Sequence, residues 1–182
     1  MCEVLNNASV SAFIGAFSAF ILVMLTDIRR RYRDRSLLRL LISDSGDHSQ
    51  KKLTSVKMNR EMVTENNNIT DAPFMPFSTQ SIRDFQVRAL DVLGTQEKQS
   101  VDAIIYWMES INDLLNSATS CASKIKTLIK SNASTQERDD VLKDYLEILR
   151  EGEKNLEYLI SMVKLHKQKQ YRKVVEFLHP VF

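Results

Sequence analysis

Residues 4–26 read VLNNASVSAFIGAFSAFILVMLT and contain no charged side chain. As a helix, these 23 residues would be about 34 Å long, against roughly 30 Å for the hydrocarbon core of a bilayer. Within residues 10–25 the only polar side chains are Ser11 and Ser18, whose hydroxyls can bond to carbonyls of the same helix. A core helix of a soluble protein usually keeps one polar face. The stretch therefore predicts a transmembrane helix, with a buried core helix and a cleaved leader as alternatives.

A cluster of positive charge follows this apolar run directly. Its members are Arg29, Arg30, Arg31, Arg33 and Arg35. A secretory signal peptide has the opposite order, with positive charge first and a small-residue cleavage site last. Because arginine-rich flanks stay in the cytoplasm, we expect the N-terminus outside, residues 29–182 inside, and the guanidinium groups near anionic headgroups. The expected location is a bacterial inner membrane, crossed once.

Small side chains recur on one side of the predicted span. Ser11, Gly15 and Ala19 follow one another at steps of four residues, which stacks them on one helix face. In lipid, small residues allow two helix backbones to approach closely. The stripe predicts self-association of the span or pairing with another span. The alternative is that small residues are simply common in membrane helices.

The composition beyond the span predicts one all-helical domain. The chain has only four glycines and three prolines among 182 residues, which is typical of helical proteins rich in Leu, Ile, Lys and Glu. About 150 residues remain after the span, enough for one hydrophobic core. We divide the chain into a transmembrane anchor at 1–28, a basic juxtamembrane helix and turn at 29–47, and a cytoplasmic helical bundle at 48–182.

Two long helices form the predicted frame of the bundle. Apolar side chains recur at steps of three and four residues through about 96–130 and again through about 135–178. Between the two helices, Ser134 and Glu137 match a capping box, and Pro180 stops the second helix. The short connection predicts a long antiparallel helical hairpin. Gly152 lies on the second apolar stripe, where close approach of a neighbouring helix is the expected reason for a glycine and a helix bend is the alternative.

Shorter elements complete the expected bundle. The basic segment should continue the membrane helix as far as residues 43–47, whose composition predicts a turn. A weakly amphipathic helix then covers 48–65. Another helix is expected to run from a cap at Ser78 or Thr79 to Leu93, after which Gly94 fits a left-handed C-terminal cap.

A loop with two prolines, at 73 and 76, separates these two helices and cannot be a regular helix. It carries three large apolar side chains, Phe74, Met75 and Phe77. Apolar side chains of this size need to be covered by other groups. Two interpretations are open: the loop plugs one end of the bundle, or it docks a partner protein.

The end of the last predicted helix is basic. Its cations are Lys164, Lys167, Lys169, Arg172 and Lys173, and residues 164–173 include no acid. Apolar residues follow, so this end resembles amphipathic segments that lie on anionic membrane surfaces. The alternative is a solvated helix end whose apolar residues pack on the bundle.

No set of residues in the sequence points to catalysis. The four glycines cannot build a phosphate-binding loop, and the spacing of His48, His166 and His179 matches no metal motif. Cys2 and Cys121 fall on opposite sides of the predicted membrane, so they cannot form a disulfide with each other. We expect a non-enzymatic protein with no cofactor, metal, nucleic acid or small-molecule substrate. Its expected partners are membrane lipid and either another protein or further copies of itself.

Two functions agree with this outline. In the first, the helical domain mediates protein–protein interaction or self-association at the membrane, and the span serves as its anchor. In the second, the protein is a membrane effector of the toxin or phage-defence type, whose span oligomerises and permeabilises the bilayer when the helical domain is triggered. The first function is the main prediction and the second is its alternative.

Overall fold

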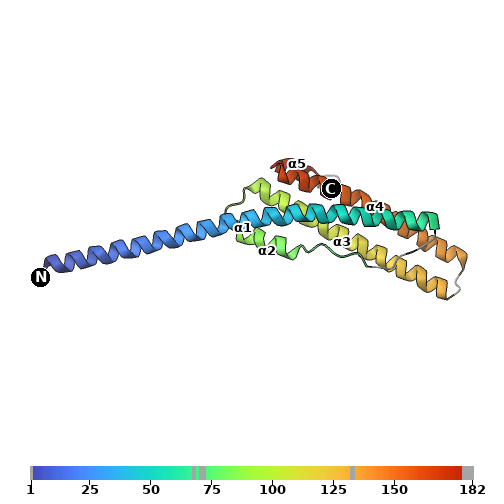
Figure 1. Ribbon diagram of the computed structural model, residues 1–182, viewed down its shortest axis with the longest axis horizontal. Coiled ribbons are helices and arrows are strands. Elements are labelled where there is room, and N and C mark those ends of the chain that lie inside the picture. The colour runs from blue at the N-terminus through green and yellow to red at the C-terminus, as the bar shows by residue number, and fades with distance from the viewer. Residues whose placement is uncertain (1, 67–68, 70–72, 132–133, 178–182) are drawn as a thin grey trace.

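One helix, α1, takes up more than a third of the chain and runs from Cys2 to Asn66. Its 65 residues extend over about 97 Å. In the computed structural model, the first part of α1 projects alone and the second part lies along the other helices (Figure 1). Those helices are α2 (Gln80–Arg88), α3 (Thr95–Lys130), α4 (Thr135–Lys167) and α5 (Tyr171–Glu176). The structure describes residues 2–66, 69, 73–131 and 134–177, with side chains from residue 10 onward except that of residue 66.

The described residues form helices and connecting loops and contain no strand, so the all-helical prediction is confirmed. α3 packs most extensively on α4, which returns alongside it and also packs on α1 (Figure 1). The short α2 lies against α1, and α5 folds back over α3 and α4. The core is therefore enclosed by the second part of α1 together with α3 and α4.

The first part of α1 is not covered by any other described part of the protein. Every residue from 10 to 30 is exposed, including Phe13 at 72% and Val23 at 68%. This part is long and apolar enough to cross a membrane, and none of its most apolar window is buried. A buried core helix, one of the alternatives left open by the sequence, is therefore wrong for these residues.

From residue 31 onward, α1 has one buried face. The buried side chains recur at steps of three and four residues or their sums, as a stripe packed against neighbouring helices requires. They include Leu38, Ile42, Ser49, Leu53, Val56 and Val63. Most of this stripe packs on α4 and α2. The same helix thus changes from fully exposed to half buried within one turn.

The turn predicted at residues 43–47 is wrong, because α1 continues through it. The Ser45 and Ser49 hydroxyls donate to the carbonyls of Ile42 and Ser45 at 2.6 and 2.7 Å, so both serines are satisfied inside the helix. Gly46 faces α4 rather than ending a helix. A Cβ at this position would lie 2.8 Å from Val163 Cγ1. Gly46 therefore allows α1 and α4 to approach closely.

That role was expected of Gly152, and the expectation is wrong. A Cβ on Gly152 would meet its nearest neighbour, Leu115 Cδ2, at 3.6 Å, which is an ordinary van der Waals distance. Nearby, the helix start expected from Ser134 is present: Ser134 is the N-cap of α4 and accepts a bond from the Glu137 N–H at 3.3 Å. Local capping chemistry was therefore easier to predict than helix–helix distance.

Two helix ends differ from the sequence predictions. α2 ends at Arg88 rather than Leu93, and Gly94 is the extended N-cap of α3, with φ −69° and ψ 155°, rather than a left-handed C-cap. α4 ends at Lys167 instead of continuing to 178, because Lys169 takes a left-handed conformation with φ 60°. The N–H groups of Lys169 and Gln170 close the end by donating to His166 and Leu165 carbonyls, both at 2.9 Å. Pro180 and the rest of 178–182 lie outside the described residues.

Candidate functional site

The arginine cluster lies where α1 leaves the bundle. Arg29, Arg30 and Arg33 are exposed, as contact with headgroups would require. Arg31 also bonds within the protein: it pairs with Asp27 at 2.7 Å and with Asp91 in the connection between α2 and α3. Arg35 was predicted to face the membrane surface but reaches a buried acid of α3 instead. Arg31 and Arg35 therefore connect α1 to the α2–α3 connection and to α3.

The buried acid is Glu97, which is only 2% exposed. Arg35 Nη2 lies 2.5 Å from Glu97 Oε2, and Arg39 Nε lies 2.8 Å from Oε1. Burial alone would raise the pKa of Glu97, but the hydrogen bonds and charges of the two arginines outweigh it and lower the pKa. Glu97 is thus a carboxylate at neutral pH that links α1 to the start of α3.

The same cluster extends to the end of α4 and to α5. Arg39 Nη2 donates to the Tyr171 hydroxyl at 3.0 Å, and the Tyr171 ring lies 5.0 Å from the ring of His166. His166 is 3% exposed, with Nδ1 2.8 Å from the Ser100 hydroxyl. Burial lowers the pKa of His166 to about 4, with Glu97 opposing the shift and Arg39 adding to it. His166 is therefore neutral at physiological pH.

This Glu97 cluster connects α1, α3, α4 and α5 at the end of the bundle nearest the exposed part of α1. Its members are Arg35, Arg39, Glu97, Ser100, His166 and Tyr171. Sequence reasoning missed Glu97 and Ser100, because an acid in the first turn of a charged helix predicts a solvated side chain. The one available signal was Glu97 lying on the same helical face as the apolar Val101 and Ile104.

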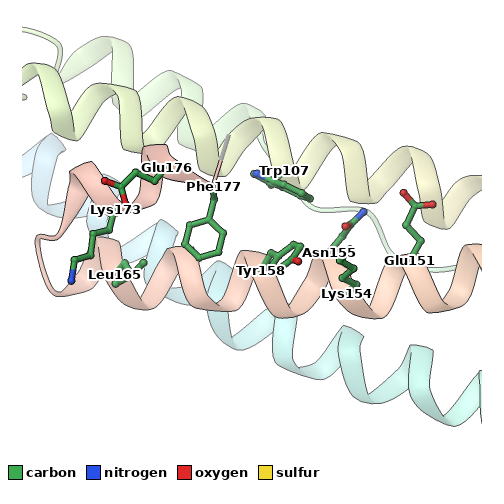
Figure 2. Close-up of a pocket in the computed structure, with 9 residues that line it drawn as sticks. All are labelled: Trp107, Glu151, Lys154, Asn155, Tyr158, Leu165, Lys173, Glu176 and Phe177. Atoms are coloured by element: carbon green, nitrogen blue, oxygen red, sulfur yellow. The ribbon is translucent and has the colours of Figure 1, made fainter. Parts of the chain in front are cut away.

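A second candidate site is an aromatic pocket of about 650 Å³ between α3, α4 and α5 (Figure 2). Trp107, Tyr158 and Phe177 form a series of edge-to-face contacts along it, with ring centres 5.8 and 5.9 Å apart. Trp107 is 8% exposed, and its indole N–H finds no hydrogen-bond acceptor among the described residues. Lys154 and Glu151 lie at the side of the pocket (Figure 2). The aromatic rings form the apolar wall of the pocket, and the other lining residues include the polar or charged Asn155, Lys173 and Glu176, a combination suited to binding a partly apolar ligand.

The three large apolar side chains of the proline loop differ in how deeply they are buried. Phe77 is 6% exposed, so docking of this side chain to a partner is wrong. Its backbone N–H and C=O both bond to the Asn112 side-chain amide, at 2.7 and 3.1 Å, and Lys52 Nζ lies 4.8 Å from the ring centre. Phe74 is half-buried against the core, whereas Met75 is 76% exposed. The loop therefore lies against α1 and the middle of α3 and does not plug one end of the bundle, and Met75 is the exposed one of its three large apolar side chains.

The basic end of α4 lies farther along the bundle than a membrane contact would favour. Lys167 and Lys169 line a groove of about 420 Å³ together with Arg39 and Tyr171. Arg39 follows Ile28 by 11 residues, which is roughly 16 Å along α1. Of the other cations of this end, Lys164, Arg172 and Lys173 are exposed. Membrane contact by these five side chains stays a prediction.

The small residues of the predicted span face open space. Ser11, Gly15 and Ala19 are all exposed, and nothing lies within 4 Å of a Cβ built on Gly15. The stripe is therefore available to another helix. Among the described residues, no group of three or more His, Cys, Asp or Glu side chains could hold a metal ion. Cys121 is a free thiol packed at the edge of the core, and burial raises its pKa.

These features define an all-helical protein with one helix that is long and apolar enough to cross a membrane. No protein-family model, no curated protein and no solved structure matches the chain. Its function has to be inferred from its own residues.

Proposed function

We propose that the protein is a non-enzymatic, single-pass membrane protein whose helical bundle mediates protein–protein interaction or self-association at the cytoplasmic face of a bacterial inner membrane. The observation that carries this proposal is the exposure of residues 10–30 of α1. Nine Leu, Ile, Phe and Val side chains lie between residues 10 and 25. Each favours the membrane centre by about 0.3–0.6 kcal/mol, which amounts to several kcal/mol in total.

The orientation follows from the exposed arginines. Arg29, Arg30 and Arg33 remain available to anionic headgroups, and they follow the span rather than precede it. Such flanks are retained in the cytoplasm. The bundle is then the cytoplasmic part and the few residues before the span are the external part.

The continuity of α1 supports a role as a rigid tether. The helix passes from the proposed span into the bundle without a break, so the bundle cannot swing about a loop. Residues 31–66 of α1 are about 52 Å long, so the bundle packed on them extends that far from the membrane. A partner bound to the bundle, for example near the aromatic pocket or Met75, would be held at a set distance from the bilayer.

Self-association is the most direct use of the span. Gly15 lies on the same face as Ser11 and Ala19, with free space around it. Ser18 adds to this face, because seven residues bring a helix back to within roughly 20° of its starting direction. Small and hydroxyl-bearing side chains on one face favour close helix pairs in lipid. The same polar face is the observation that favours the alternative, an effector whose span oligomerises and permeabilises the bilayer.

Protease protection in bacterial cells tests the location and orientation. With the full chain expressed in cells, the bundle should remain intact when protease is added to spheroplasts and should be digested after lysis. It should also stay in the membrane fraction after alkaline extraction. Digestion of the bundle in intact spheroplasts would reverse the orientation, and release into the soluble fraction would refute the span.

A matched pair of variants tests association and separates the two functions. Gly15→Leu should reduce crosslinking between spans, whereas Phe13→Leu on the opposite face should not. A membrane-potential dye then reports permeabilisation during expression. Depolarisation that Gly15→Leu abolishes favours the effector, and an unchanged potential favours the tether.

A further inference from the structure

The connection between α2 and α3 points toward the exposed part of α1. Residues 87–96, here called the α2–α3 corner, lie at the end of the bundle where α1 emerges alone (Figure 1). Asp91 of the corner pairs with Arg31. Arg31 follows Ile28, the last residue of the predicted anchor, by only three residues, or about 4.5 Å along the helix.

This distance matches the depth of the lipid headgroups. The headgroup layer on each side of a bilayer is about 5–7 Å thick. If α1 crosses the membrane up to residue 28, the α2–α3 corner lies within that layer rather than above it. By contrast, Lys167 and Lys169 at the basic end of α4 share a groove with Arg39, which lies roughly 16 Å beyond Ile28 along α1.

The residues of the corner suit such a position. Val87 is 70% exposed and Leu90 is 45% exposed, although both are apolar. Arg88 between them is exposed as well. Asp91, the acid of the corner, is paired with Arg31 and so does not repel an anionic surface. Apolar side chains flanked by cations are typical of protein segments that lie in membrane interfaces.

We propose that the α2–α3 corner inserts Val87 and Leu90 among the headgroups of an anionic bilayer, and that this is a second membrane contact beside the span. The inference rests on the proposed function, because it requires α1 to cross the membrane. Two membrane contacts at one end of a rigid bundle fix the tilt of its long axis relative to the bilayer and prevent its rotation about α1. The corner thereby decides which face of the bundle is turned away from the lipid.

Fluorescence of a single labelled cysteine tests the contact. In full-length protein with Cys2 and Cys121 replaced by serine, an environment-sensitive dye is attached at Gln96→Cys in the corner. Separate proteins carry it at Met58→Cys on the distant part of α1 or at Phe13→Cys in the span. The proteins are reconstituted, at low protein-to-lipid ratio, in phosphatidylcholine–phosphatidylglycerol vesicles containing lipids with a nitroxide near the headgroup or deep in the acyl chain.

The expected result is that the headgroup nitroxide quenches the label at 96 several-fold more than the label at 58. The label at 13 should be quenched by the deep nitroxide. If 13 is quenched while 96 behaves like 58, the corner contact is wrong and the span stands. If 13 is not quenched, the span is wrong, and the corner contact falls with it.

A variant pair supplies the second readout. Val87→Asp combined with Leu90→Asp should reduce quenching at 96 to the level seen at 58, since two carboxylates are repelled by anionic headgroups. Met75→Asp, an exposed apolar side chain on the proline loop, is the matched control and should change nothing. Quenching at 96 that survives the double substitution would overturn the proposal. So would a label at 96 that is shielded from water but not quenched by lipid, because another copy of the chain would then cover the corner.

Discussion

The two parts of α1 have the same backbone and opposite surroundings. Residues 10–30 are exposed on every face and carry no charge before Asp27, whereas residues 31–65 bury one apolar face and turn a charged face outward. In the second part, Arg60 and Lys57 pair with Glu153 and Glu157 of α4 at 2.5 and 3.0 Å. Among the described residues, those of the first part form no ion pair outside α1.

The two parts of α1 differ in what surrounds their side chains. The second part packs on other helices of the protein, so each of its buried residues has specific neighbours that a substitution would disturb. The first part has no protein neighbour, and its side chains need only an apolar surrounding. Substitutions that remove hydrophobicity should therefore act on the first part, and those that change shape should act on the second.

Charge placed in the first part should have the largest effect. Phe17→Asp with Ile21→Asp should release the chain from membranes, because each Asp near the bilayer centre disfavours insertion by about 3 kcal/mol. Leu40→Asp with Met58→Asp is the matched control, since both positions are 55% exposed on the second part. Alkaline extraction of membranes followed by immunoblotting measures the distribution. Equal release by both pairs would contradict the distinction between the two parts.

Side-chain shape should matter for the stability of the bundle only in the second part. Ile42 is fully buried, so Ile42→Ala should lower the free energy of unfolding of the bundle by about 3 kcal/mol. Leu22→Ala should leave it unchanged, because Leu22 is 64% exposed and outside the bundle. Urea unfolding in detergent micelles can be followed by the fluorescence of Trp107, the single tryptophan. A similar loss in both variants would mean that the first part packs on protein.

Acid should weaken the bundle while leaving the span in place. The pKa of His166 is about 4 in the fold and 6.5 in a free chain, so the unfolded chain takes up the proton first as pH falls. This contribution to stability is complete above pH 6.5 and is lost toward pH 4, by about 3 kcal/mol. Glu97, whose pKa is lowered from 4.5, adds a further loss below that value.

Urea unfolding repeated between pH 7.5 and 4 would show this slope, with no change in membrane extraction. His166→Gln should flatten the part between pH 6.5 and 4. An unchanged slope in that variant would assign the effect to other groups.

Two glycines provide the smallest and most selective comparison. Gly46→Ala should destabilise the bundle by about 1 kcal/mol, because its Cβ would lie 2.8 Å from the buried Val163. Gly152→Ala should stabilise it by up to about 1 kcal/mol, since alanine is the better helix former and its Cβ finds ordinary contact distances. Thermal unfolding by circular dichroism ranks the two variants. The opposite order would mean that α1 and α4 are not as close at Gly46 as they are here.

Local sequence patterns predicted the helices but not the Glu97 cluster. The apolar run at 10–25, the low glycine and proline content and the Ser134 cap were readable because each depends on residues close in sequence. Glu97 depends on Arg35 and Arg39, which lie 62 and 58 residues away and on another helix. No local pattern distinguishes such an acid from a solvated one.

The sequence by itself determined that the chain is helical and that one stretch is apolar on all sides, since hydrogen bonding and side-chain polarity act locally. Tertiary structure decided where the helices end and which faces meet. α1 continues through Gly46, where a turn was predicted, and packs there against Val163 of α4. α4 ends just before Lys169, which takes a left-handed conformation at a position without a glycine. The physical reason at Gly46 is that its contact with Val163 exists only after distant segments have come together. The end of α4 is closed by local bonds from Lys169 and Gln170, but a lysine gives no sequence signal for the left-handed conformation that makes them possible.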